Sequence, residues 1–217
     1  MKRPITKEER PILSGELALA INIIINSFAV VLMLYSGAGI SAISSVPFAF
    51  SEVLPHLSLG TWTYLFQGLL VLILMFLQRF VPQYLFSFVV GFLFGQLVDV
   101  HELWIHILPQ TLPCRILYFI ISYLLLSVGI ALSNRCGLPI VPTDLFPREV
   151  SQISGIHYPR IKISFDVLCL VVTACMTKLF LGHLDGLGIG TVLAALTIGK
   201  MVGIIGSWLD KHLVNAP

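Results

Sequence analysis

Six long apolar segments constrain this chain of 217 residues more than any other feature. A helix needs roughly 20 mainly apolar residues to cross the hydrocarbon core of a bilayer. Only 11% of the residues are charged, whereas about a quarter are charged in soluble domains. The sequence therefore predicts an all-α polytopic membrane protein with a single membrane domain, 1–217. Its predicted spans are about Leu17–Ile40, Thr61–Leu77, Gln83–Val98, Leu112–Leu132, Ile161–Leu181 and Gly186–Leu209.

Basic residues predict how the spans are oriented. With a cytoplasmic N-terminus, ten Lys and Arg residues fall on the inner side and only Arg115 and Lys178 on the outer side. Such an excess of inner positive charge is typical of membrane proteins. The prediction is six transmembrane helices with both termini cytoplasmic. The ten inner residues are Lys2, Arg3, Lys7, Arg10, Arg79, Arg135, Arg148, Arg160, Lys162 and Lys211.

Two connections contain prolines and are not plain loops. Gly37–Leu59 is too apolar for a solvated loop, which predicts either an interfacial helix or a broken, re-entrant segment. A re-entrant segment is tolerated only where protein or a wet cavity satisfies its backbone. Its counterpart, Gly137–Tyr158, is predicted to face the cytoplasm. A third stretch, Val100–Leu108, reads as a short amphipathic segment at the outer surface.

The two halves, about 1–108 and 109–217, follow the same order of span, proline-bearing connection, span and span. Their alignment pairs Pro47 with Pro142 and Gln67 with Asp166. Because three spans reverse the side of the membrane, the halves would lie in opposite orientations, as a 3+3 inverted repeat. Secondary transporters are commonly built in this way, with the substrate site where the repeats meet. The alternative is that any six-span chain divides into two threes.

Ionisable side chains inside spans are costly and usually face a partner or a cavity. Asp166 and Lys200 lie at similar depths from the inner face, which predicts a shared polar pocket. The alternative is that Asp166 pairs with Lys162 four residues earlier while Lys200 extends to the interface. A titratable Asp166 would couple transport to protons.

Amides add to this polar set. Asn22 and Asn26 share one helix face, and Gln67 is the repeat counterpart of Asp166. They could coordinate a polar substrate, or they could be hydrogen-bonding contacts between helices. The candidate substrate-binding residues are Asn22, Asn26, Gln67, Asp166 and Lys200.

Glycines are frequent in the last span. Gly199 and Gly203 form a GxxxG face that predicts close helix packing. The run Gly186–Gly190 could instead open a helix whose N-terminal amides meet an anion.

No motif supports an enzyme, a metal site or a bound cofactor. His101 and His106 in HELWIH are five residues apart, whereas a zinc helix of the HExxH type needs a spacing of four. The cysteines contain no CxxC pair and indicate neither a disulfide framework nor a zinc site. The net charge of +2 is too small to suggest a nucleic-acid partner. The cysteines are Cys114, Cys136, Cys169 and Cys175.

Three stretches, Val90–Asp99, Arg160–Asp166 and Gly188–Gly199, resemble the bacterial YczE/YitT-like membrane proteins. These families are largely uncharacterised. The resemblance therefore implies a multi-pass protein of the bacterial cytoplasmic (inner) membrane and supplies no substrate.

The leading hypothesis is a small secondary transporter or exporter of a polar small molecule or ion. The alternatives are a non-transporting accessory or assembly partner in the membrane, and a substrate-binding subunit of a larger transporter. The lipid bilayer is the surrounding partner, and the small size is compatible with a homodimer.

Overall fold

The structure, a computed structural model, describes residues 12–13, 15–77, 83–135, 138, 140–212 and 214–215. Within these ranges it is helical apart from one parallel pair of two-residue strands, β1 (Ile12–Leu13) and β2 (Val214–Asn215). Some residues used in the predictions lie outside the described ranges: Lys2, Arg3, Lys7, Arg10, Arg79 and Cys136.

Six helices in the described part of the chain are long and apolar enough to cross a membrane. The predicted all-α, six-span fold is thus confirmed, and the protein is a multi-pass membrane protein. Its orientation across the bilayer stays a prediction. The six are α1 (Gly15–Tyr35), α3 (Leu59–Leu77), α4 (Gln83–Ile105), α5 (Leu112–Ser133), α7 (Tyr158–Phe180) and α8 (Ile189–His212).

The third of these helices is longer than predicted. The predicted surface stretch Val100–Leu108 is not separate, because α4 continues without a break to Ile105. A contact from elsewhere in the chain holds this end of α4: the Asp99 carboxylate accepts a hydrogen bond of 2.7 Å from the N–H of Gly60, in the first turn of α3. The hydropathy of residues 100–108 alone could not predict this contact, because Gly60 is distant in the sequence.

Two short helices, α2 (Ala42–Val53) and α6 (Pro142–Ser154), occupy the proline-bearing connections. With 12 and 13 residues, each is about 20 Å long at a rise of about 1.5 Å per residue, too short to cross about 30 Å of hydrocarbon. Residues 42–49 of α2 are all buried, so α2 lies within the protein and not on a membrane surface. The first half of α6 is also largely buried, so this connection is no plain loop either. The side of the membrane that it faces stays a prediction.

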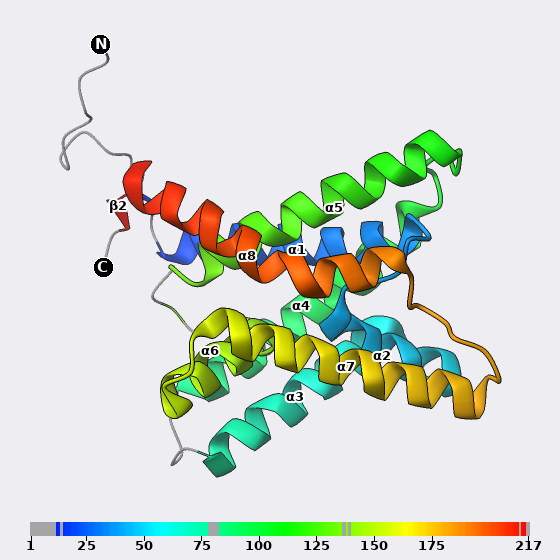
Figure 1. Cartoon of the computed structure of the whole chain (residues 1–217), viewed down its shortest axis with the longest axis horizontal. Helices are drawn as coiled ribbons and strands as arrows, with labels where there is room; N and C mark the ends of the chain where they lie inside the picture. The colour runs from blue at the N-terminus through cyan, green and yellow to red at the C-terminus, as the bar shows by residue number, and fades with distance from the viewer. Residues whose placement is uncertain are drawn as a thin grey trace.

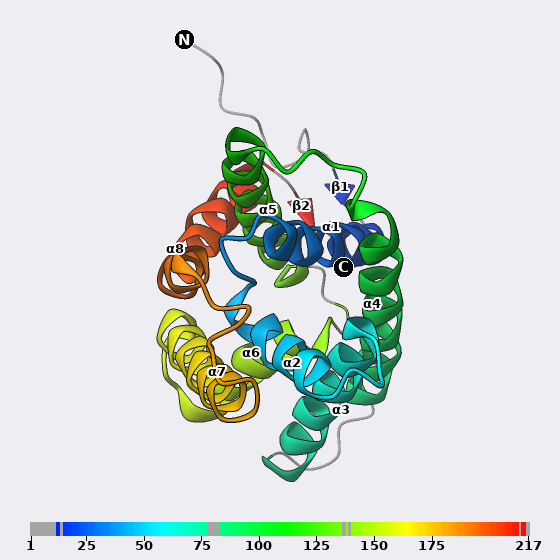
Figure 2. The same cartoon turned by 90° about the vertical axis from the view of Figure 1, so that its right-hand side faces the viewer.

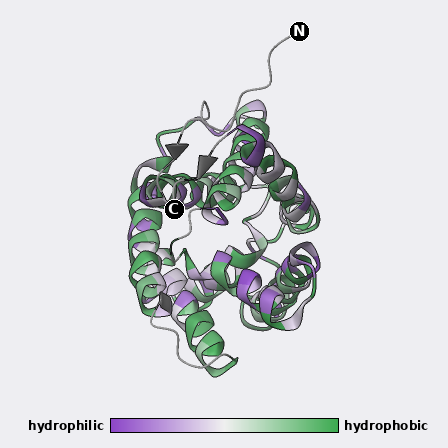
Figure 3. Cartoon of the chain, turned by 90° about the vertical axis from the view of Figure 1, so that its left-hand side faces the viewer, coloured by the Kyte–Doolittle hydropathy of each residue, from purple (hydrophilic) through white to green (hydrophobic). Residues whose placement is uncertain are grey.

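The short helices lie between α3 and α7 and complete a ring with the long helices (Figures 1 and 2). Around the ring, α1 contacts α4 and α5, α5 contacts α8, α8 contacts α7, and α4 contacts α3. The short α2 and α6 contact both α3 and α7 and so fill the space between them. Hydrophobic residues predominate on the outward faces (Figure 3), where side chains such as Phe76 and Ile189 are largely exposed. Lipid contact accounts for this exposure.

The contacts between helices are the same in the two halves of the chain when α1, α2, α3 and α4 are matched with α5, α6, α7 and α8. Contacts α1–α4, α2–α3 and α3–α4 correspond to α5–α8, α6–α7 and α7–α8. The contact α2–α7 corresponds to α6–α3, and α2–α8 to α6–α4. The helices also pair Pro47 with Pro147, each the sixth residue of its short helix, where the sequence alignment used Pro142.

The links between helices pack against each other through glycines. The N–H of Ile40 donates to the Gly186 carbonyl, and the N–H of Gly190 donates to the Ala38 carbonyl, each at 3.0 Å. A Cβ on Gly188 would overlap the Ala38 carbonyl oxygen. The run Gly186–Gly190 therefore allows two backbones to pack closely. The Gly190 N–H is not free for an anion, because it already donates to Ala38.

The predicted GxxxG packing is wrong for the described part of the chain. No described atom lies within 4 Å of a Cβ built on Gly203, which is exposed, and Gly199 meets only atoms at ordinary contact distance. The glycine-dependent contact lies at the start of α8, not along its middle.

The two glycines Gly188 and Gly203 predict opposite responses to alanine. Gly188→Ala should lower the free energy of unfolding by roughly 1–3 kcal/mol, because its Cβ must displace backbone. Gly203→Ala should be neutral or slightly stabilising, since alanine favours the helix. Thermal unfolding of the purified proteins in detergent measures both. Equal losses in the two variants would contradict the packing described for the links.

Candidate functional site

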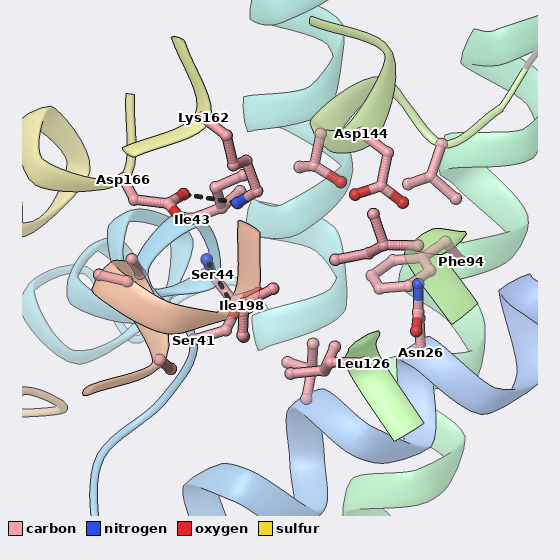
Figure 4. A pocket seen from close by; sticks show the side chains of 17 residues that line it. Asn26, Ser41, Ile43, Ser44, Phe94, Leu126, Asp144, Lys162, Asp166 and Ile198 are labelled. Carbon is pink, nitrogen blue, oxygen red and sulfur yellow. Dashed lines mark hydrogen bonds and ion pairs between the residues drawn. The ribbon is translucent and has the colours of Figure 1, made fainter. Parts of the chain in front are cut away.

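A cavity of about 40 Å³ lies where the two short helices begin. This volume holds a few water molecules. Of the helices in the described ranges, only α3 contributes no lining residue. Figure 4 shows side chains approaching the cavity from different helices. Its polar lining consists of Asn26, Ser41, Ser44, Thr143, Asp144, Lys162 and Asp166.

A buried ion pair forms one wall. The Lys162 Nζ lies 2.6 Å from Asp166 Oδ1, and the two residues are only 5% and 2% exposed. Both belong to α7, where a spacing of four places them on one face. This is the local pairing that the sequence left as an alternative. A buried pair costs desolvation free energy and survives only with good geometry.

Lys200 does not reach this cavity. It is exposed on α8, whereas Ala195 and Ile198 of the same helix line the cavity. Two residues rotate the helix face by about 200°, which turns Lys200 away from Ile198. The structure therefore does not bring Lys200 and Asp166 into the predicted common pocket.

The predicted amide pair lies next to the cavity. Asn26 Nδ2 donates to Asn22 Oδ1 at 2.6 Å, and both residues are almost fully buried. The remaining Asn26 Oδ1 and Asn22 Nδ2 have no hydrogen-bond partner within the described part of the chain. Of these two residues, Asn26 lines the cavity, and Asn22 is joined to it by the hydrogen bond with Asn26.

Gln67 is buried beside the first residue of α6. It is 1% exposed, and neither atom of its amide has a partner among the described residues. Its Oε1 and the ring of Pro142 would both crowd a Cβ on Gly91, so the three meet at one point. Gln67 is not part of the cavity lining, and it lies behind the start of α6.

Asp144 is the cavity residue that sequence reasoning missed. It is 6% exposed, and no ion pair reaches it within the described ranges. Asp144 lies in α6, outside the six candidate spans, and burial raises its pKa to about 6, while Lys162 and Arg148 oppose that rise. The available signal was its position in the first turn of a helix opened by Pro142, where acids are favoured.

Both short helices present their N-terminal turns to the cavity. Ala42 and Ile43 of α2 and Thr143 of α6 line it. The first N–H groups of a helix have no acceptor within that helix, and the helix dipole places roughly half a positive charge there. The site thus combines two partial positive charges, one buried ion pair and one carboxyl, that of Asp144, with no ion-pair partner in the part of the chain that the structure describes.

Together, the fold and the site define a multi-pass helical membrane protein with an internal cavity that has several polar lining residues. Residues 13–207 match a family of unknown function, DUF6198, and the chain belongs to that family. No curated protein and no solved structure matches the chain. The resemblance to YczE/YitT-like proteins stays a prediction.

The buried ion pair predicts strong coupling between its partners. Lys162→Met leaves Asp166 buried without a cation and should cost about 3–5 kcal/mol of unfolding free energy, while Lys162→Met with Asp166→Leu should recover most of it. Asp210→Asn, which breaks the more exposed pair with Arg135, is the control and should cost less than about 1 kcal/mol. Additive losses in a double-mutant cycle would contradict the coupling.

The raised pKa of Asp144 predicts a pH-dependent stability. A carboxyl whose pKa is higher in the folded state contributes stability that is complete below about pH 4 and is lost as the pH rises through about 6. A rise of about two pH units corresponds to about 3 kcal/mol. Asp144→Asn should remove this component from melting profiles recorded between pH 4 and 8. Glu16→Gln, at an exposed position of α1, is the control, and an unchanged profile in Asp144→Asn would exclude the assignment.

Proposed function

We propose that this protein is a small secondary transporter of a polar small molecule or ion in the bacterial cytoplasmic membrane, and that the cavity between α2 and α6 is its substrate site. The observation that carries this proposal is that two short helices begin at one cavity with polar lining residues, among six apolar helices long enough to cross a membrane. Helices interrupted at membrane depth are tolerated where they line a cavity. Transporters use such helix ends to hold polar substrates.

The exchange pattern of the helix contacts supports a 3+3 inverted repeat. Gln67 and Asp166 are each the ninth residue of α3 and α7, in keeping with their pairing in the sequence. Pairing of β1 with β2 brings the two ends of the described chain together, as an even number of spans requires. The excess of basic residues in the inner segments favours the cytoplasmic side for both ends.

Buried charge supports a functional role for the cavity. Ionisable groups at membrane depth are expensive, and by default they mark a substrate or ion pathway. Lys162, Asp166 and Asp144 come together here with Asn26, whose Oδ1 has no hydrogen-bond partner among the described residues. Rocking of one half against the other would give the site access to each side of the membrane in turn. The proposal requires no catalytic step.

A cavity-filling variant tests this function. We expect a thermal-shift screen of the purified protein against metabolites and ions to identify a stabilising ligand, since a ligand at 100 times its Kd adds about 2.7 kcal/mol. Ala195→Leu should abolish that stabilisation and the flux of the same ligand into liposomes, because Ala195 is buried and lines the cavity.

Ala20→Leu, at an exposed position of α1, is the matched control and should retain both. A folded Ala195→Leu protein with full ligand binding and flux would refute this site. Failure of the wild type to bind or move any solute, together with a stoichiometric co-purifying protein, would favour the accessory role.

A further inference from the structure

The electrostatics of the cavity favour a negative charge at one point. The first turns of α2 and α6, two helices of 12 and 13 residues, meet there. Two helix N-termini together place roughly one positive charge at the cavity. In Figure 4, Ser41 and Ser44 lie on one side of the cavity and Asp144 lies on the other.

Asp144 supplies that negative charge from within the protein. Lys162 and Asp166 neutralise each other at 2.6 Å, which leaves Asp144 as the carboxyl without an ion-pair partner in this cavity among the described residues. When Asp144 is ionised, its own carboxylate serves as the anion for the two helix ends. When Asp144 is protonated, the helix ends have no counter-charge.

Asn26 independently points to a polar ligand. It is 3% exposed, lines the cavity and has an Oδ1 without a partner in the part of the chain that is described. The two amides of Asn22 and Asn26 can be turned over together without losing their mutual hydrogen bond. Asn26 can therefore offer either a carbonyl or an NH₂ group to a ligand.

We infer that the cavity binds a small monovalent anion in exchange for the charge of Asp144, so that one proton is bound to Asp144 whenever the anion is bound. The inference rests on the proposed transport function and names its substrate class. A cavity that holds a few water molecules suits a small anion such as a halide, nitrate or formate. Translocation of the loaded site would carry the anion and the proton together.

Asp144 gains or loses its proton within the pH range in which anion binding can be measured. Burial raises its pKa to about 6, so each pH unit above that value should weaken the apparent anion affinity about tenfold. The ionisable groups that interact with Asp144 are Lys162, Asp166 and Tyr158 on α7 and Arg148 on α6 itself. The residue of α3 that lies near the start of α6 is the uncharged Gln67.

Anion binding and proton movement can be measured on the purified full-length protein. In detergent, sodium salts of fluoride, chloride, nitrate and formate are compared at constant ionic strength against gluconate, from pH 5 to 8. We expect one or more small anions to stabilise the wild type, with about a tenfold loss of affinity per unit above pH 6. In liposomes, an inward gradient of the same anion should acidify the lumen beyond the level in protein-free liposomes, where only the neutral acid crosses the bilayer.

Asp144→Asn should bind the anion with a pH-independent affinity and should not acidify the lumen, and Glu16→Gln should behave as the wild type. If the wild type binds the anion equally well at pH 5 and pH 8, the proposed exchange of the anion for the charge of Asp144 is wrong. This outcome needs no variant. Stabilisation by sodium, potassium or methylammonium, lost in Asp144→Asn, would replace the anion by a cation and leave the transport function standing. Flux of only a larger neutral solute would likewise overturn the inference alone, whereas absence of any flux would overturn the transport function itself.

Discussion

The need to satisfy backbone polar groups away from water governs this structure. A helix of 12 or 13 residues cannot cross the hydrocarbon core, and its ends expose amide and carbonyl groups that lipid cannot bind. The short helices α2 and α6 are therefore held between α3 and α7, with their first turns buried. The same requirement leaves their first turns facing each other across a polar cavity and not a dry core.

Other features of the fold follow from this enclosure. The link before α2 must pass close to the link before α8, and the backbone contact between Ala38 and Gly190 needs glycine at Gly188. Ser45 of α2 forms a hydrogen bond of 2.8 Å with Thr173 of α7, which ties a short helix to a span of the other half. Each half thus completes the surroundings of the short helix of the other half.

Patterns local to the chain predicted the spans, the two irregular connections, and the shared face of Asn22 and Asn26. They succeeded because hydropathy and helical spacing are properties of one segment. The remaining features depend on partners far away in the sequence. In the sequence, Asp144 belongs to a charged connection with Arg148 and Glu149. Its burial results from the packing of α6 against α3 and α7, which the sequence pattern does not show.

The predicted contacts of Lys200 and Gly203 are wrong because local patterns suggested contacts that the packing of the helices does not form. Their residue types and spacing suggest contact, yet both lie on the outward face of α8. The side of a helix that meets the protein is set by packing against α5 and α7, and a weakly amphipathic, glycine-rich span gives little sign of it. In contrast, the pairing of Lys162 with Asp166 needs only one helix, and the sequence already contained it as an alternative.

Access to the cavity is the central claim, and cysteine labelling at Ser44 tests it most directly. Ser44 lines the cavity in the first turn of α2 and is 9% exposed. A Ser44→Cys variant in a cysteine-free background would be treated in proteoliposomes with a membrane-impermeant thiol reagent, applied separately from each side. Alternating access predicts labelling from both sides and protection by the transported solute. Complete resistance to labelling from both sides, in a protein that still folds, would show a sealed structural core and would contradict the account. The native cysteines to be replaced are Cys114, Cys136, Cys169 and Cys175.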